Sequence, residues 1–446
     1  MHQLLIDDAN ARQAVPNQAG QRVRWTGLHG SGKYLALTEA LAQHTDLVLV
    51  VTADSTQADA WADALEYFMS DGTQQRVMRF PDWETLPYDN FSPHQDIISQ
   101  RLSTLNALRD STARVLCVPI GTLLQRIPPP EFLAGACFNL NRGQRFSVQE
   151  QRLLLDAAGY NATDMVVERG QYAVRGALMD IFPMGADSPV RIDLFDDEID
   201  TLRTFDPDTQ RTLENIASLQ LLPAKEFPFD DAAIARFRER WHNTFNVDVR
   251  RCSIYQDVSS YIAPNGIEYY LPFFFDQLAN LFDYLPDNLL TVVEDGVDEA
   301  AQHFLEEVAN RYESLRYDIE KPILPPAELF LGYAEFRQGL LAAPRIELLE
   351  QQDKDVKHEV RLASKPLPDL HANARLATPT QALQNFIETC EKPILFVAET
   401  AGRREVFDEM LGKAGIVTHP VAHFSEYVKE PRHSIMVAPL QQGLWL

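Results

Sequence analysis

The sequence has few cysteines, a deficit of basic residues and no long apolar run, and each shortage excludes a class of protein. The four cysteines lie far apart and form no CxxC pair, which argues against a zinc ribbon or a disulfide framework. No apolar run approaches the roughly 20 residues that span a bilayer, and the polar, acidic N-terminus does not resemble a signal peptide. These absences predict a cytoplasmic protein that does not act in a membrane.

The deficit of positive charge bears on nucleic acids. The chain carries 64 acidic and 40 basic residues, a net charge of -24. Binding to duplex DNA depends largely on basic side chains that neutralise phosphates. The chain is therefore expected to be a poor DNA-binding protein by itself, apart from any local basic face, and its acidity favours a protein partner.

At 446 residues the chain is too long for one hydrophobic core, and its length suggests about three domains. Its 45% hydrophobic and 23% charged residues are typical of a folded globular protein. Near-continuous apolar strands alternate with helical patterns in the first part of the chain. The expected strands are residues 46–53 and 114–120, and the expected helices are 55–68 and 95–108. This alternation predicts a parallel α/β sheet.

After a triple proline at residues 128–130 the pattern changes. One helix and several short strands are expected there, at 148–158, 165–167, 178–182, 190–195 and 201–205. They indicate an inserted α+β domain with an antiparallel sheet. The earlier pattern then resumes, with a helix at 231–244, a strand at 289–293 and a helix at 297–312. A small α/β domain follows, with expected elements at 394–398, 402–413 and 434–438.

The chain is thus predicted to be an α/β protein whose parallel sheet is interrupted by an insert. Residues 1–136 and 219–345 form the two parts of the interrupted domain, residues 137–218 form the insert, and residues 346–446 form the small last domain. Linkers are expected at residues 322–326 and 350–365, where proline and polar residues gather.

A phosphate-binding loop is incomplete at its last position. The sequence GLHGSGKY at residues 27–34 fits GxxxxGK[ST] through Gly27, Gly30, Gly32 and Lys33, but it ends in Tyr34. In a working loop the backbone N–H groups surround the phosphates, the lysine reaches the outer ones, and the final hydroxyl binds Mg²⁺. The oxygen of Tyr34 lies at the far end of a rigid ring, so phosphate binding could survive here but metal-assisted hydrolysis should not.

The second half of an ATP site is an apolar strand that ends in Asp-Glu. The candidate strand, at residues 289–293, is followed by Glu294 and Asp295 in the reverse order. Exchanging the two acids moves each carboxylate by about one methylene, which matters where reacting groups must be held closely. Read separately, the loop is a glycine-rich turn and the acids are a strand-end pair of no relevance. Together they favour a degenerate ATP site, with no cofactor required and residual ATP or ADP binding left open.

Longer motifs resemble a known family. They are WETLPYD (83–89), SPHQD (92–96), RLSTL (101–105), DIFPMG (180–185), FDDEID (195–200) and LLPAKEF (221–227). These strings are similar to those of the bacterial transcription-repair coupling factor family (Mfd), and the similarity covers residues 20–320 well and the last domain more loosely. The resemblance implies a degenerate helicase-like fold of RecA type with a phosphate loop. It also implies that the full-length protein is an ATP-dependent DNA translocase that displaces stalled RNA polymerase, using parts absent from these 446 residues.

The same region is similar to the excision-repair helicase UvrB, notably in LFDYLPD at residues 281–287. A tyrosine-rich hairpin that UvrB uses to hold DNA has no room here, because residues 86–89 lead almost directly into Ser92 and Pro93. This departure argues against a UvrB-like helicase.

In both families the inserted domain binds the repair protein UvrA, and the family's contact positions correspond to Arg175, Arg191 and Phe195. Arg191 and Phe195 are four residues apart on one expected strand, so both should lie on one face. Arginine and an aromatic ring on one face are typical of a protein-binding hot spot. In the alternative interpretation Arg191 pairs with Asp193, Asp197 or Glu198, and Phe195 belongs to the core.

Three functions follow from these observations. The first is a UvrA-recruiting module for transcription-coupled nucleotide excision repair, with no catalytic residue and no metal site. The second is an active UvrB-like ATPase or helicase, which Tyr34 and the order of Glu294 and Asp295 oppose. The third is nucleotide binding without hydrolysis.

Overall fold

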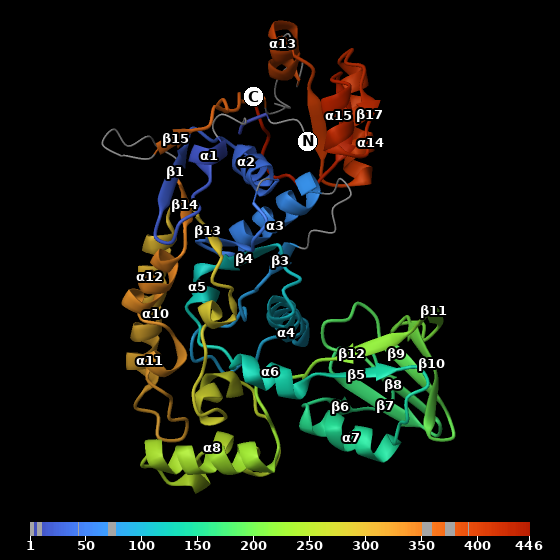
Figure 1. Cartoon of the computed structure of the whole chain (residues 1–446), viewed down its shortest axis with the longest axis vertical. Helices are drawn as coiled ribbons and strands as arrows, with labels where there is room; N and C mark the ends of the chain where they lie inside the picture. Colours follow the sequence, from blue (N-terminus) through green and yellow to red (C-terminus); the bar gives the residue numbers. More distant parts are fainter. Residues whose placement is uncertain are drawn as a thin grey trace.

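The computed structural model describes residues 4–6, 11–42, 44–69, 77–349, 359–370, 380–390 and 392–446. The largest sheet has the strand order β15-β1-β14-β13-β2-β4-β3 and is parallel throughout. Its strands are β1 (Arg22–Thr26), β2 (Val48–Thr52), β3 (Val77–Arg79), β4 (Val115–Pro119), β13 (Leu290–Val293), β14 (Arg345–Leu348) and β15 (Glu359–Arg361). The predicted parallel α/β sheet is therefore confirmed (Figure 1).

Both faces of this sheet are covered by helices, which explains its continuous apolar strands. On β2, Val48 and Val50 face one core while Leu49 and Val51 face the other. The first core is closed by α2 (Gly32–Leu41) and α3 (Ser55–Met69). The second is closed by α4 (Gln95–Arg109), α5 (Ile120–Leu123), α10 (Val297–Leu315) and α12 (Tyr333–Ala342).

The insert leaves the sheet after α6 (Pro130–Ala136), which starts at the triple proline. Its first strand β5 (Phe138–Asn141) pairs antiparallel with β12 (Ser218–Leu221), so the chain enters and leaves the insert through neighbouring strands. Between them lie α7 (Val148–Ala157) and a six-stranded sheet of order β11-β10-β9-β8-β7-β6. These strands are β6 (Asn161–Ala162), β7 (Gln171–Arg175), β8 (Leu178–Ile181), β9 (Val190–Phe195), β10 (Glu198–Phe205) and β11 (Thr212–Ile216).

The last unit has a parallel sheet of order β16-β18-β17 and its own small core, which includes Phe396, Leu411 and Ile435. Its elements are α13 (Gln381–Thr389), β16 (Leu395–Ala398), α14 (Ala401–Lys413), β17 (His419–Pro420), α15 (Phe424–Lys429) and β18 (Ser434–Val437). Figure 1 shows this unit beside α2 and α3, at the opposite end of the molecule from α8 (Asp231–Thr244).

Three predictions about local structure are wrong. Residues 165–167 form no strand, because the edge strand of the insert is the short β6 just before them. The predicted boundary at residue 346 falls inside β14, and Glu359–Arg361 of the expected linker at 350–365 form β15, so the first sheet continues beyond both. Residues 350–358 of that linker lie outside the described residues.

Within the described ranges, no helix is both long enough and apolar enough to cross a bilayer. No group of three or more His, Cys, Asp or Glu side chains in the same ranges is placed to hold a metal ion.

Candidate functional sites

The phosphate-loop motif lies between β1 and α2, where the sequence analysis places it. Gly27 and Gly30 have φ angles of 75° and 56°, which only glycine adopts readily, and α2 begins at Gly32. Ser31 precedes the helix but makes no side-chain cap to it. The local geometry is that of a glycine turn opening a helix N-terminus, a place where backbone N–H groups commonly bind anions.

Lys33 and Glu294, which the sequence assigns to the two halves of one site, are brought together. The Lys33 ammonium forms an ion pair with the Glu294 carboxylate, and Glu294 is only 8% exposed. The lysine nitrogen also lies 5.1 Å from the centre of the Tyr34 ring and 5.6 Å from that of Trp61. The positive charge of Lys33, which would bind a phosphate in a working loop, is therefore already neutralised by Glu294.

Tyr34 packs edge-on against Trp61, with ring centroids 4.7 Å apart. Burial, followed by the nearby Glu294 carboxylate, raises the pKa of Tyr34 well above its usual value. Its hydroxyl therefore stays protonated. The Oδ1 atom of Asp295 accepts a hydrogen bond of 3.1 Å from the Gly296 N–H at the start of α10.

A segment near the C-terminal end of the chain, residues 442–445, lies over the loop. The Ser31 N–H donates to the Gly443 carbonyl at 2.9 Å, and the Ser31 hydroxyl donates to the Gln442 carbonyl at 2.6 Å. A Cβ atom on Gly30 would lie 2.2 Å from the Gly443 oxygen. With this backbone in place and Tyr34 at the metal-ligand position, the residues do not fit a bound Mg·ATP.

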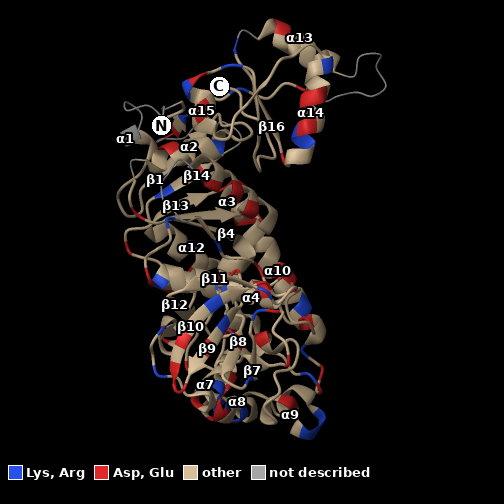
Figure 2. Ribbon diagram, turned by 90° about the vertical axis from the view of Figure 1, so that its right-hand side faces the viewer, with Lys and Arg blue, Asp and Glu red and all other residues tan. Residues whose placement is uncertain are grey.

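The outer face of the insert sheet carries the other predicted site. Along β9, Val190 and Ile192 point into the core, while Arg191, Asp193 and Phe195 point to the opposite face. Phe195 is 74% exposed, so the interpretation that it belongs to the core is wrong. In Figure 2 basic and acidic segments lie side by side on β9 and β10.

Arg191 is held by a neighbour on the same face. Its Nε and Nη2 atoms donate to the two carboxylate oxygens of Asp180 at 2.7 and 2.9 Å, and its guanidinium lies 4.8 Å from the centre of the Phe205 ring. The hydrogen bonds that Arg191 donates to Asp180 raise the pKa of Arg191. The sequence suggests Asp193, Asp197 or Glu198 as an internal partner, whereas the structure pairs Arg191 with Asp180 on β8, the adjacent strand.

Arg175 is exposed at the end of β7, and its guanidinium donates to the Asp164 carbonyl. The strand register aligns Arg175, Leu178 and Asp193 in one row, with Phe195 just beyond them. Arg175 and Phe195 therefore lie at the same end of the sheet, and Arg191 lies two rows further in, at the next position on the same face.

Arg203 is a further basic residue on this face that the sequence analysis missed. It is aligned with Arg191 across β9 and β10, and it pairs with Asp193. The period of two along residues 201–205 could have indicated it, but a register shift between Ile199 and Thr201 hides its alignment with Arg191.

Comparisons with known proteins bear on both sites. The model of the UvrB interaction domain family matches residues 138–227, and that of the MFD D3 domain family matches residues 386–446. The transcription-repair-coupling factor of Escherichia coli (strain K12) is 41% identical over 97% of this chain, and that of Haemophilus influenzae is 40% identical over 92%. The chain is homologous to the N-terminal region of the transcription-repair-coupling factors.

The resemblance stated from the sequence motifs is thus confirmed. The chain spans 37% and 35% of the lengths of these two coupling factors. A more distant coupling factor, from Bacillus subtilis, is 28% identical over 60% of this chain. The first family match contains the whole outer face of the insert, and the second contains Gln442 and Gly443.

Proposed function

We propose that this chain recruits the repair protein UvrA in transcription-coupled nucleotide excision repair, and that it does so through the outer face of its insert. The match of the UvrB interaction domain to residues 138–227 is the observation that carries this proposal. RNA polymerase and double-stranded DNA are contacted, in this proposal, by parts of a coupling factor outside these 446 residues. The net charge of -24 is in keeping with a module that binds protein.

Phe195 and Arg175 are the anchors we assign to the UvrA interface. An exposed ring supplies apolar area, and a guanidinium at the same end of the sheet supplies a planar group for carboxylates; aromatic and arginine side chains are common anchors in protein interfaces. Arg191 contributes less directly, because its Nε and Nη2 atoms already donate hydrogen bonds to Asp180. Its exposed edge and its charge remain available to a partner.

The large sheet, in this proposal, is a degenerate helicase-like platform of RecA type that does not hydrolyse ATP. Tyr34 at the metal-ligand position and the Lys33–Glu294 ion pair support it. The competing proposal, an active UvrB-like ATPase or helicase, requires Lys33 and the loop amides to be free for phosphate. DNA-stimulated ATPase activity of this chain above background would favour that competing proposal.

The test of UvrA recruitment is a binding titration with purified UvrA. Phe195→Ala and Arg175→Ala should each weaken binding by about 2 kcal/mol, roughly a 30-fold change in Kd. Matched controls are Phe91→Ala, whose ring is 66% exposed outside the insert, and Arg250→Ala on the exposed turn at residues 249–251. Equal affinity of the parent chain and the Phe195 and Arg175 variants would overturn the proposal.

A further inference from the structure

The phosphate loop already has a ligand, and that ligand is backbone from the same chain. Ser31 is fully buried, and both its N–H and its hydroxyl donate to carbonyls of residues 442 and 443. A carbonyl oxygen carries partial negative charge, so it is attracted to the positive end of α2 much as a phosphate oxygen is. It carries no full charge, however, and so it needs no lysine to balance it.

The state of Lys33 agrees with a neutral ligand. Its ammonium forms an ion pair with Glu294. A phosphate in the same place would compete with Glu294 for the lysine and would have to displace the Gly443 carbonyl from the Ser31 N–H. Both changes oppose nucleotide binding.

Position 30 requires glycine because the backbone of Gly443 approaches it closely. A Cβ at this position would lie 2.2 Å from the Gly443 oxygen and 3.0 Å from a methyl of Leu367. Side chains do not approach atoms that closely, so any other residue at position 30 would push the segment away. The glycine pattern of the motif thus remains useful even though the metal ligand is gone.

The segment is fixed from its other side by residues that follow β15. The Lys365 N–H donates to the Trp445 carbonyl at 2.7 Å, and the Lys365 ammonium lies 4.9 Å from the centre of the Trp445 ring. The preceding residue, Ser364, holds the loop itself, since its hydroxyl accepts from the His29 N–H at 2.6 Å and donates to the Gly27 carbonyl at 3.2 Å. Hydrogen bonds therefore connect the loop, the residues that follow β15 and the segment to one another.

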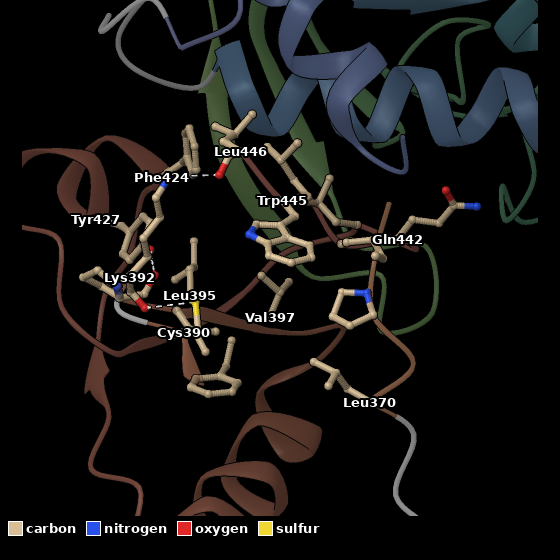
Figure 3. Close-up of a pocket in the computed structure, with 18 of the residues that line it drawn as sticks. Leu370, Cys390, Lys392, Leu395, Val397, Phe424, Tyr427, Gln442, Trp445 and Leu446 are labelled. Carbon is tan, nitrogen blue, oxygen red and sulfur yellow. Dashed lines mark hydrogen bonds between the residues drawn. The ribbon is translucent and has the colours of Figure 1, made fainter. Parts of the chain in front are cut away.

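Further contacts join the last unit to the end of α3. Tyr67 at the end of α3 donates to the Met436 sulfur at 2.9 Å, and Phe68 packs against Phe424 with centroids 5.2 Å apart. Between these contacts and the segment lies a cavity of about 750 Å³. Figure 3 shows Trp445 within it, above Leu395 and Val397, while the Gln442 side chain extends away from it. The contact of the segment with the loop is a further attachment, on the other side of this cavity.

We propose that the former phosphate loop is a docking socket for backbone residues 442–443, which attaches the last unit to the large sheet and excludes phosphate groups. The socket comprises residues 27–33. This inference does not depend on UvrA binding, because the socket and the outer face of the insert share no residue.

Trp445 provides a specific reporter for the test. Four of the five tryptophans are buried: Trp25, Trp61, Trp83 and Trp241. Trp445, which belongs to the segment itself, is half-buried. Quenching of native fluorescence by acrylamide should therefore report mainly on Trp445. Gly30→Ala should increase the quenching constant as the segment leaves the socket.

Gly20→Ala is the matched control, because Gly20 also has a positive φ, of 71°, but a Cβ there meets nothing closer than 3.9 Å. It should leave Trp445 quenching unchanged. Equal quenching constants for the parent chain and Gly30→Ala, with both folded by circular dichroism, would overturn the socket.

The exclusion of phosphate is tested by hydrogen exchange of the peptide that contains Ser31. Trp445→Ala weakens the segment without altering the loop, and we expect it to accelerate exchange of the Ser31 amide about five-fold, equivalent to about 1 kcal/mol for one lost hydrogen bond. Inorganic tripolyphosphate should slow exchange in Trp445→Ala and have no effect in the parent chain. Equal protection by tripolyphosphate in both proteins, or no protection in either, would overturn the exclusion.

Discussion

Arg191 holds Asp180 through two parallel hydrogen bonds on the outer face of the insert, and Asp180 is only 4% exposed. A bidentate arginine–carboxylate pair of this kind fixes both side chains. Arg191 is therefore part of the structure of the face as well as a proposed contact for UvrA. The two roles predict different outcomes for different substitutions.

Arg191→Ala should destabilise the insert by about 2 kcal/mol, because it leaves a buried carboxylate without its partner. Asp180→Asn removes the charge pair but keeps the guanidinium. If Arg191 contacts UvrA, Asp180→Asn should retain most of the affinity and Arg191→Ala should lose it. Thermal unfolding and a UvrA titration on both variants measure this, and equal loss of affinity in the two would assign Arg191 a structural role alone.

Glu268 predicts a pH dependence of stability. It lies in the 3-10 helix at Ile267–Phe273, and burial raises its pKa to about 7 although the Ser92 hydroxyl donates to it at 2.7 Å. The native state therefore binds a proton that the unfolded chain, with the ordinary carboxyl pKa, has released. Stability should fall as the pH rises from about 4.5 to about 7, by at most about 3 kcal/mol.

Glu268→Gln should flatten this part of the pH profile, since the amide keeps an acceptor for Ser92 and does not ionise. Glu239→Gln, at an exposed position on α8, should leave the profile unchanged. Chemical denaturation at several pH values between 5 and 8 measures both. A profile of the same slope in Glu268→Gln and the parent chain would contradict the assignment.

A buried ion pair joins α4, which covers the large sheet, to the segment that follows β12, the last strand of the insert. Arg101 on α4 is fully buried, and its Nε donates to Glu226 at 2.8 Å, while the indole of Trp83 donates to the same carboxylate at 2.9 Å. Arg101→Ala should destabilise the protein by about 3–5 kcal/mol, because it leaves a buried charge unpaired. Trp83→Phe should cost about 1 kcal/mol for the lost hydrogen bond. Arg109→Ala, at the more exposed end of the same helix, is the control in thermal unfolding.

Restoring the missing hydroxyl of the phosphate loop should not restore nucleotide binding. Tyr34→Thr supplies the side chain that the motif lacks, but the Gly443 carbonyl still occupies the Ser31 N–H. We expect no binding of a fluorescent ADP analogue and no ATPase activity in this variant. Saturable binding by Tyr34→Thr alone would show that the tyrosine, and not the segment, is the barrier.

The sequence predicts the large sheet well because its strands are buried on both faces. The expected strand at 46–53 and the helix at 55–68 become β2 and α3 with shifts of one or two residues. The strands β14 and β15 were missed, because they complete the sheet from far along the chain and are short and partly polar. No local pattern reveals that residues 359–361 pair with β1.

The candidate sites were predictable as motifs but not as contacts. Period-two alternation placed Arg191 and Phe195 on one face correctly. The partner of Arg191 lies on a neighbouring strand, and the partner of Ser31 lies 411 residues away, so only the folded chain brings them together. The replacement of the metal ligand by Tyr34 can be read from the sequence, whereas the contact of residues 442–443 with the loop cannot.

The pairing of β5 with β12 places the two ends of the inserted segment side by side. A segment joined in this way can be lengthened, shortened or exchanged without stretching any other connection of the sheet. The partner-facing surface and the platform beneath it are thus free to evolve at different rates. A lineage could change which protein it recruits while its motor-like scaffold stays as it was.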